Sequence, residues 1–305
     1  MAAHNEWFYP RGTLAGDGWD CVVDTSIAGW KHTGIRVANL DERGVTLPAD
    51  ENERLLVPLG GSFRVAHEDT ITVLEGRASV FDGPTDVLYL GAGSRSFVRG
   101  PGRLAVAEAP AMTRFPSRRI PRDEVPVEIR GAGRDTRQVH NFGTPNTLDA
   151  ASFIVCEVIT PAGNWSSHPA HKHDQHIPGQ ESRLEEIYYF EAAVSREILS
   201  RDLASRDLPA GKAPDPFGMF ATYSSPAGEI DTNVIVRTGD IALVPHGYHG
   251  PAVAAPEYDL YYLNVMAGPG PERVWQMTDD PAQAWIRGSW ESVPTDPRLP
   301  YLTGT

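Results

Sequence analysis

Short apolar runs that alternate with polar positions make up most of the chain from about residue 33 onwards. The runs consist of β-branched, leucine and aromatic residues, and glycine, proline and aspartate separate them. Alternation with a period of two is typical of half-buried β-strands, and the separating residues are those that form turns. In the first half of the chain the pattern predicts strands in "GIRVANL", "ERLLVPLGGSFRVA", "DTITVLEG", "DVLYLGAGSRSFVRG" and "RLAVAEAPAM".

A polar segment separates these strands from a second set. Residues 118–148 are rich in arginine, glycine and proline, a composition typical of a connector between two units. The pattern therefore predicts an all-β protein of two tandem antiparallel barrels, and we place the units at residues 1–130 and 131–305. The second set of strands is predicted in "FIVCEVITPAG", "RLEEIYYFEAAV", "GMFATYSS", "EIDTNVIVRTGDIALVPHG" and "YDLYYLNVMAGP".

Three other segments carry weaker patterns. The stretches "FDGPTDVLYLGAG" and "VRTGDIALVPHG" have a similar form in the two halves and predict a distant internal repeat. Residues 195–216 are polar and predict a solvated insertion that begins with a short helix. The tail from residue 279 predicts one helical turn and then an extended, proline-rich chain. This tail is expected to pack over another surface of the chain or over a second subunit, so a homo-oligomer is one expectation.

The balance of charge narrows the set of partners. The 305 residues carry a formal net charge of −13, and an acidic surface without a basic patch repels both nucleic acid and anionic membranes. No stretch approaches the ~20 apolar residues needed to span a bilayer, and the N-terminus lacks a basic segment followed by an apolar run. Cys21 and Cys156 are the two cysteines, so a disulfide framework and a thiolate metal cluster are excluded. We therefore expect a cytoplasmic protein whose partner is a small molecule.

The first candidate for chemistry is the segment "SSHPAHKHDQ", residues 166–175. His171 and His173 are two positions apart, so in a strand both imidazoles project from one face while Lys172 points to the other. Two imidazoles on one face form half of a metal site, and imidazole suits zinc, iron, manganese and nickel alike. The alternative is a merely polar or pH-sensitive surface.

The strand predicted in "RLEEIYYFE" supplies a carboxylate. Its alternation places Glu186 and Tyr188 on one face and Glu185 on the other. Leu184 and Phe190 share the face of Glu186, which predicts that this face looks into a barrel. An unpaired carboxylate is costly there unless a cation or a hydrogen-bond network satisfies it. The alternative is that the two glutamates form an exposed acidic pair at the start of a strand.

A third histidine follows the turn in "GDIALVPHGYHGP". The turn from Pro245 to Gly247 delivers His249 at the start of the next strand, where it supplies a third nitrogen. The resulting set of three histidines and one glutamate leaves one or two positions open for substrate, as a catalytic metal requires. His246 competes for this place, but its position at the tip of the turn favours exposure to solvent.

This order of residues, a His-x-His pair, a glutamate and then a histidine after a Gly- and Pro-bounded turn, resembles the paired motifs of the cupin superfamily. The separation of His173 and Glu186 is longer than usual, so "DQHIPGQESRL" is predicted to be an excursion before the ligand strand. Longer strings are similar to the 5-deoxyglucuronate isomerases of myo-inositol catabolism, whose relatives include the 5-keto-4-deoxyuronate isomerases. These strings are "NWSSHPAHKHD", "LEEIYYFE", "GDIALVPHGYHGP", "YDLYYLNVMAGP", "SVFDGPTDVLYL", "EIRGAGRDTRQVHNFGTPN" and "VWQMTDDPAQAW".

The resemblance implies a bicupin with one divalent metal ion in the C-terminal barrel. No predicted strand of the N-terminal half contains a His-x-His pair, so we expect that barrel to be structural. The resemblance also implies a cytoplasmic aldose–ketose isomerase that converts 5-deoxy-D-glucuronate to 2-deoxy-5-keto-D-gluconate. Because this sugar acid is a carboxylate, an arginine should bind it, and Arg137 is the candidate. The implied metal ligands are His171, His173, Glu186 and His249. The other candidates are Glu186 and Tyr188 for catalysis, and Lys172, Tyr248, Tyr262 and His168 for substrate binding.

The chain departs from the family at the predicted substrate pocket. His168 stands where the family has a tyrosine, and Phe220 and Ala221 stand where a glutamine and an arginine are expected. The second change removes polar groups, so a related and less charged sugar derivative is a further candidate substrate. The same ligands also suit a non-haem iron oxygenase, and a non-catalytic sugar-binding bicupin is the third alternative.

Overall fold

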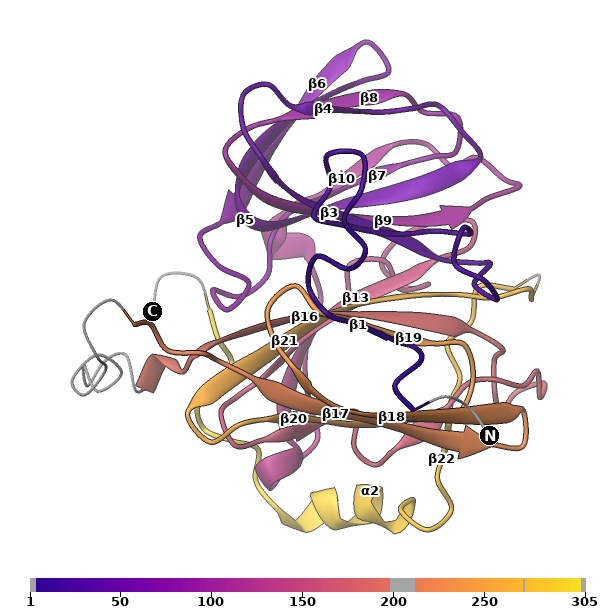
Figure 1. Ribbon diagram of the computed structural model, residues 1–305, viewed down its shortest axis with the longest axis vertical. Coiled ribbons are helices and arrows are strands. Elements are labelled where there is room, and N and C mark those ends of the chain that lie inside the picture. Colours follow the sequence, from indigo (N-terminus) through magenta and orange to yellow (C-terminus); the bar gives the residue numbers. More distant parts are fainter. Residues whose placement is uncertain (1–3, 198–211, 271, 303–305) are drawn as a thin grey trace.

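Figure 1 shows the computed structural model of the chain, which describes residues 4–197, 212–270 and 272–302. Strands dominate, and they form two barrels stacked one above the other, with the N-terminal barrel in indigo and purple at the top. Neighbouring strands pair in antiparallel fashion, as β5 with β9 and β16 with β21. The expected all-β fold of two antiparallel barrels is confirmed.

The upper barrel is one nine-stranded sheet built around β5. This strand pairs with β7 and β9 through its first half and with β6 and β8 through its second half. The change of partners falls at Gly61, whose φ is +94° and whose Cβ, if present, would lie 2.1 Å from the carbonyl oxygen of Pro101, so only glycine fits. The strands are β2 (Cys21–Val23), β3 (Gly34–Leu40), β4 (Val45–Leu47), β5 (Asn52–His67), β6 (Thr70–Arg77), β7 (Val87–Leu90), β8 (Ser96–Arg99), β9 (Gly102–Pro110) and β10 (Arg118–Ile120).

The lower barrel consists of two sheets that face each other. A seven-stranded sheet faces the upper barrel in the order β1, β19, β16, β21, β13, β12, β11, and a six-stranded sheet lies below it (Figure 1). The first sheet contains β1 (Phe8–Tyr9), β11 (Val127–Arg130), β12 (Arg137–His140), β13 (Ile154–Thr160), β16 (Glu185–Val194), β19 (Ile241–Val244) and β21 (Tyr258–Ala267). The second contains β14 (Trp165–Ser166), β15 (His171–Lys172), β17 (Gly218–Ser225), β18 (Gly228–Val236), β20 (Tyr248–Ala254) and β22 (Thr278–Asp279). Two short 3-10 helices, η1 (Arg122–Glu124) and η2 (Gly133–Asp135), flank β11.

Three apolar clusters form the core, one inside each barrel and one between the barrels. The seven-stranded sheet contributes to two of them. In β16, Ile187 and Tyr189 pack between the barrels, whereas Tyr188 and Phe190 pack inside the lower barrel. A strand buried on both faces is an almost continuous apolar run, as "IYYF" is here, and each such side chain stabilises the fold by ~1.5–3 kcal/mol.

The expected internal repeat is present in the pairing of the strands. The stretch "FDGPTDVLYLGAG" contains β7, which pairs with β5, and "VRTGDIALVPHG" contains β19, which pairs with β16 in the same way. The division of the chain at residue 130 stays a prediction. β1 precedes the upper barrel in the chain and yet pairs with β19 of the lower barrel, with Phe8 opposite Ala242.

The C-terminal tail forms the expected helical turn and then an extended segment. α2 (Trp285–Ser289) and η3 (Trp290–Ser292) lie below the six-stranded sheet in Figure 1. The tail then returns to the lower barrel, where the backbone N–H of Tyr301 donates a 2.6 Å hydrogen bond to Oε1 of Gln138. Most of the predicted insertion, residues 198–211, lies outside the described residues. None of the described helices is long and apolar enough to cross a membrane.

Candidate metal centre

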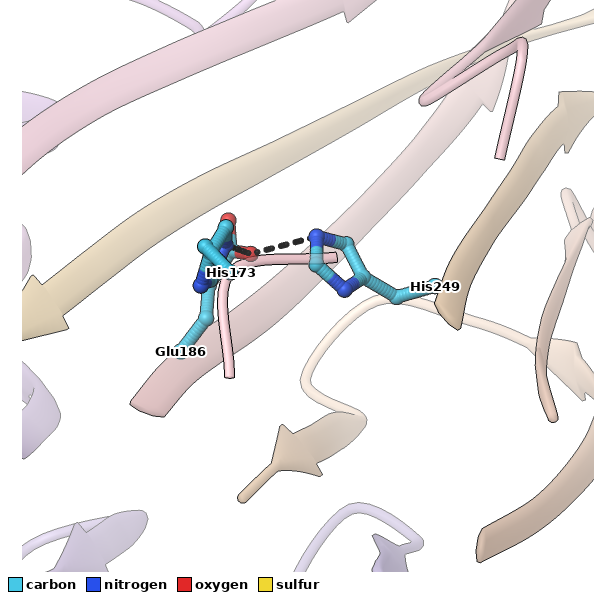
Figure 2. A group of neighbouring side chains, drawn as sticks. All are labelled: His173, Glu186 and His249. Atoms are coloured by element: carbon cyan, nitrogen blue, oxygen red, sulfur yellow. Dashed lines mark hydrogen bonds and ion pairs between the residues drawn. The ribbon is translucent and has the colours of Figure 1, made fainter. Parts of the chain in front are cut away.

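Three side chains from separate segments of the chain meet inside the lower barrel (Figure 2). His173 directly follows β15, Glu186 lies in β16 and His249 lies in β20. Oε2 of Glu186 is 3.0 Å from Nε2 of His173 and 3.2 Å from Nε2 of His249. The three side chains offer ligand atoms that all lie within 4.8 Å of one another, and none of the three residues is more than 2 % exposed. The predicted inward face of the glutamate strand therefore does carry a buried carboxylate beside two imidazoles.

His171 packs against this group. It lies directly opposite His249 in the pairing of β15 with β20, and the two ring centroids are 4.6 Å apart. The ring of His173 lies at the same distance from the ring of His249. His171 does not belong to the group of three residues whose ligand atoms lie within 4.8 Å of one another, so its role as a fourth ligand stays a prediction.

Backbone carbonyl groups fix the orientation of all three imidazoles. Nδ1 of His171 donates to Pro169 O at 3.1 Å, Nδ1 of His173 to Leu184 O at 3.1 Å, and Nδ1 of His249 to Gly247 O at 3.3 Å. A carbonyl oxygen can only accept, so each Nδ1 carries a proton. This is the arrangement that orients histidine ligands around metal ions. Nε2 of His173 also lies 3.0 Å from Oε2 of Glu186, where it donates to the carboxylate in the metal-free protein, and loss of that proton would free its lone pair for a metal ion.

The inner atoms of the group are suited to a cation. Nε2 of His249 has no hydrogen-bond partner among the described residues, although this histidine is fully buried. An unsatisfied buried polar atom costs about 1–3 kcal/mol, and here it faces a carboxylate oxygen, which is also an acceptor. The two nitrogens and the carboxylate thus fit a metal ion, which would accept a lone pair from each of them.

The surroundings set the protonation states that metal binding needs. Burial raises the pKa of Glu186, but the hydrogen bonds and charges of His173 and His249 outweigh it and lower that pKa to about 2. Burial, followed by the neighbouring His249, holds the pKa of His171 well below its usual range. The carboxylate is therefore ionised and His171 neutral near neutral pH.

The structure separates the two adjacent glutamates. Glu186 points into the lower barrel, whereas the carboxylate of Glu185 leaves the opposite face and accepts hydrogen bonds from the backbone of residues 31–33 in the upper barrel. Neither glutamate belongs to an exposed acidic pair, since both are at most 6 % exposed. His246, the competing ligand, contacts the backbone oxygen of Glu229 at 3.1 Å outside the group.

Two predicted tyrosines line the barrel interior beside the histidines. The rings of Tyr188 and His249 are 6.2 Å apart, and the rings of Tyr188 and Tyr262 are 5.1 Å apart. Both phenol oxygens lie near Oγ of Ser167, at 3.2 Å and 3.3 Å. Burial raises the pKa of both tyrosines, so their hydroxyl groups keep their protons and can donate hydrogen bonds.

Arg137 is buried at the edge of the same barrel. Its Nη1 donates to the backbone oxygens of Asp135 at 2.9 Å and His168 at 3.4 Å, and its guanidinium lies over the ring of Trp290. Within the described part of the chain, its side chain forms no ion pair with a carboxylate. Burial lowers the pKa of Arg137 to about 10. The side chain remains charged at neutral pH and lacks an anionic partner.

Lys172 points away from the ligand pair, as the alternation predicts, and is already fully engaged. Its Nζ donates to Oδ1 of Asp174 at 2.8 Å and to both carboxylate oxygens of Glu181 at 2.7 Å and 2.9 Å. These acceptors use all three ammonium protons. Lys172 therefore stabilises the loop that separates His173 from Glu186. Its ammonium group has no proton left to donate to a substrate.

The last two predicted residues lie outside the ligand group. Tyr248 is half-buried and stacks on Tyr223, with the ring centroids 5.2 Å apart. His168 is half-buried, and its Nδ1 lies 2.8 Å from Oδ1 of Asp135. The indole of Trp290 donates to the other oxygen of this carboxylate at 3.0 Å. Sequence reasoning missed Ser167, Asp135 and Trp290, because no spacing or periodicity links them to the histidines.

Fold and site together define a class, since this is a bicupin with a candidate His/Glu/His metal centre in its second barrel. Comparison with known proteins identifies the family. The model of the KduI/IolB family matches residues 8–286, so the chain belongs to that family. The expected family is thereby confirmed.

Curated relatives with the name 5-deoxy-glucuronate isomerase support this assignment. The protein of Geobacillus thermodenitrificans is 37 % identical over 273 residues, which cover 88 % of this chain and 90 % of the relative. The protein of Halalkalibacterium halodurans is 34 % identical over 272 residues, covering 87 % of this chain and 91 % of the relative. The names of these relatives state the same isomerase activity that is expected from the sequence.

Solved structures agree with the fold. An IolB-like protein from Salmonella typhimurium is 34 % identical, with a TM-score of 0.79 over 92 % of this chain and 99 % of that one. The oxalate decarboxylase of Lactobacillus farciminis is 10 % identical, with a TM-score of 0.60 over 97 % of this chain and 98 % of that one. The second likeness concerns the fold alone.

Proposed function

We propose that this chain is a metal-dependent aldose–ketose isomerase that converts 5-deoxy-D-glucuronate to 2-deoxy-5-keto-D-gluconate in inositol catabolism. The observation that carries the proposal is the buried group of His173, Glu186 and His249, in which Nε2 of the fully buried His249 has no hydrogen-bond partner among the described residues. The names of the relatives support the substrate.

The residues of the group would hold one divalent ion, with His171 as the candidate fourth ligand. The chemistry that such an ion would supply is polarisation of a sugar carbonyl and its neighbouring hydroxyl, which would assist the movement of a proton or hydride between adjacent carbons. Zinc, manganese, iron and nickel all suit this donor set. Glu186 is ionised and serves as a ligand.

The other interior residues bind and orient the substrate. Arg137 is charged and buried and forms no ion pair with a carboxylate of the described residues, so it is placed to bind the sugar carboxylate through two parallel hydrogen bonds. Tyr188 and Tyr262 keep their phenolic protons and donate to sugar oxygens, while Ser167 holds both hydroxyl groups. Burial of these side chains excludes water and strengthens each polar contact.

One observation favours a related substrate as the second candidate. Phe220 is fully buried, and its ring centroid lies 4.6 Å from that of Tyr188. An apolar wall therefore stands where the family resemblance implies polar side chains. A sugar derivative with fewer polar groups on that side would fit this wall better.

An assay of product formation tests the proposed function. Purified protein loaded with each candidate metal is mixed with 5-deoxyglucuronate in air and under nitrogen, and the ketose is followed by NMR. Ketose formation at equal rates in both atmospheres is expected. Conversion that requires oxygen would identify an oxygenase, and a loaded metal without turnover would refute this substrate.

A further inference from the structure

The carboxylate of Glu185 is an anchor between the two barrels. Its Oε1 accepts hydrogen bonds from the backbone N–H groups of His32 at 2.6 Å and Thr33 at 2.8 Å, and from Oγ1 of Thr33 at 3.1 Å. The N–H of Lys31 lies 3.2 Å from Oε2. Three successive N–H groups and a hydroxyl therefore satisfy one buried charge, in contacts of the stronger, charge-assisted kind.

This anchor lies next to a candidate metal ligand. Glu185 and Glu186 are neighbours at the start of β16, and the alternation of the strand sends one to the upper barrel and the other to the metal centre. The anchoring segment is itself fixed, because the buried Trp30 donates its indole N–H to Thr33 O at 2.8 Å. The upper barrel thus holds the backbone from which Glu186 projects.

The internal repeat supplies a counterpart of the anchor. Glu53 stands at the start of β5, which lies between β7 and β9 as β16 lies between β19 and β21. Its carboxylate accepts from the N–H groups of residues 151, 152 and 153 of the lower barrel at 2.7, 2.6 and 2.9 Å, and from the hydroxyl of Tyr89 at 2.8 Å. Each barrel therefore binds a carboxylate of the other through three N–H groups, and each carboxylate also accepts from one hydroxyl, that of Thr33 in the opposite barrel for Glu185 and that of Tyr89 in the same barrel for Glu53.

The residues beside the two anchors differ. The neighbour of Glu185 is the candidate ligand Glu186, whereas the neighbour of Glu53 is Arg54. The guanidinium of Arg54 is buried and donates to Oε1 of Glu108 at 2.7 Å. At the position of the upper barrel that is equivalent to Glu186, the side chain is thus a positively charged arginine that cannot bind a metal ion. Glu53 joins the barrels with the same chemistry but adjoins no candidate ligand.

We propose that Glu185 is a positioning residue for the metal centre, through which the upper barrel fixes the ligand Glu186. This inference rests on the proposed metal site in the lower barrel. Its physical basis is that a ligand must be held close to its productive geometry, and the loss of a supporting contact typically weakens metal binding by roughly 10- to 100-fold.

The experiment compares Glu185→Gln with Glu53→Gln in the full chain. The dissociation constant for Zn²⁺ is measured by competition with a chromophoric chelator, and the Tm of the metal-free proteins is measured in parallel. Both variants should lose similar stability, because each loses the same set of contacts. Glu185→Gln should weaken Zn²⁺ binding by roughly 10-fold or more, whereas Glu53→Gln should stay close to wild type.

A second pair of variants leaves both charges in place. Thr33→Val removes only the hydroxyl that contacts Glu185, and Tyr89→Phe removes only the hydroxyl that contacts Glu53. Thr33→Val should weaken Zn²⁺ binding in the same direction by a smaller factor, and Tyr89→Phe should not. If Glu185→Gln fails to fold, this second pair still tests the positioning role of Glu185. Because both carboxylates keep their charge, a change in Zn²⁺ binding would reflect positioning and not the loss of a negative charge near the metal site.

The outcomes distinguish the two proposals. Wild-type protein that binds no Zn²⁺ would overturn the metal site and this inference together. Wild-type protein that binds Zn²⁺, with equal dissociation constants in the Glu185 and Glu53 variants, would overturn the positioning role alone.

Discussion

Replacing Arg137 by methionine tests whether its buried guanidinium binds the substrate carboxylate. Arg137 is 4 % exposed, and its side chain donates hydrogen bonds to two backbone carbonyls. A hydrogen bond to a charged group contributes about 1.5–3 kcal/mol. Each 1.4 kcal/mol is a factor of ten, so the variant should lower kcat/KM for 5-deoxyglucuronate by roughly 10- to 150-fold.

The stability of this variant should follow a different course. A buried charge without a counterion is itself costly, and its replacement by an apolar side chain of similar length is often neutral or stabilising. We therefore expect little change in the Tm of Arg137→Met. Initial rates and thermal melting curves of the same preparation measure both quantities.

Arg130 provides the matched control. It lies directly opposite Arg137 in the pairing of β11 with β12, and its guanidinium contacts both carboxylate oxygens of Glu128, at 2.9 Å and 2.8 Å. Arg130→Met should lower the Tm and affect kcat/KM less. Wild-type kcat/KM in Arg137→Met, or losses of activity that simply follow Tm in both variants, would show that Arg137 does not bind the substrate carboxylate.

Three further predictions concern pH, the barrel interior and the excursion. Burial opposes the charge of His173, but Glu186 outweighs it and raises the pKa of His173 above the usual 6.5. The contact between protonated His173 and Glu186 therefore stabilises the metal-free protein below pH 6.5, and this stabilisation is lost as the pH rises through the raised pKa. Zn²⁺ affinity should rise over the same pH interval, because the metal binds the deprotonated imidazole. Tm of the metal-free protein and chelator competition for Zn²⁺, each measured across this pH range, check the two directions. Tyr188→Phe removes a neutral hydrogen-bond donor and should lower kcat by roughly 2- to 10-fold with little change in Tm, and an unchanged kcat would contradict its role. Lys172→Met leaves two buried carboxylates without their cation and should lower the free energy of unfolding by about 3–5 kcal/mol in urea titrations, whereas wild-type stability would show that the ion pairs do not hold the excursion.

Much of the fold could be predicted because strand alternation is a local property. The parity of "LEEIYYFE" placed Glu186 and Tyr188 on the inner face, and the structure has both there. The pairing of β15 with β20 could not be predicted, because it joins residues far apart in the sequence and depends on how the barrel closes. That pairing is what brings His171 opposite His249.

The polar contacts around the candidate metal centre could not be predicted from the sequence. The ammonium of Lys172 is bound by the carboxylate of Glu181 across the excursion, and no periodic pattern links the two residues. Similarly, the partner of His168 is Asp135, which lies in η2 on the far side of β12 and β13 in the sequence. Such contacts depend on tertiary packing, so only a structure reveals which polar residues are free and which are engaged.

The proposed isomerase activity depends on a metal ion held by His173, Glu186 and His249. The most direct measurement is the metal content and the rate of ketose formation of wild-type protein and Glu186→Gln, before and after chelation and metal return. We expect about one metal ion per wild-type chain, loss of activity on chelation with recovery on return, and loss of both metal and activity in the variant. Full activity in wild-type protein stripped of metal would contradict the account.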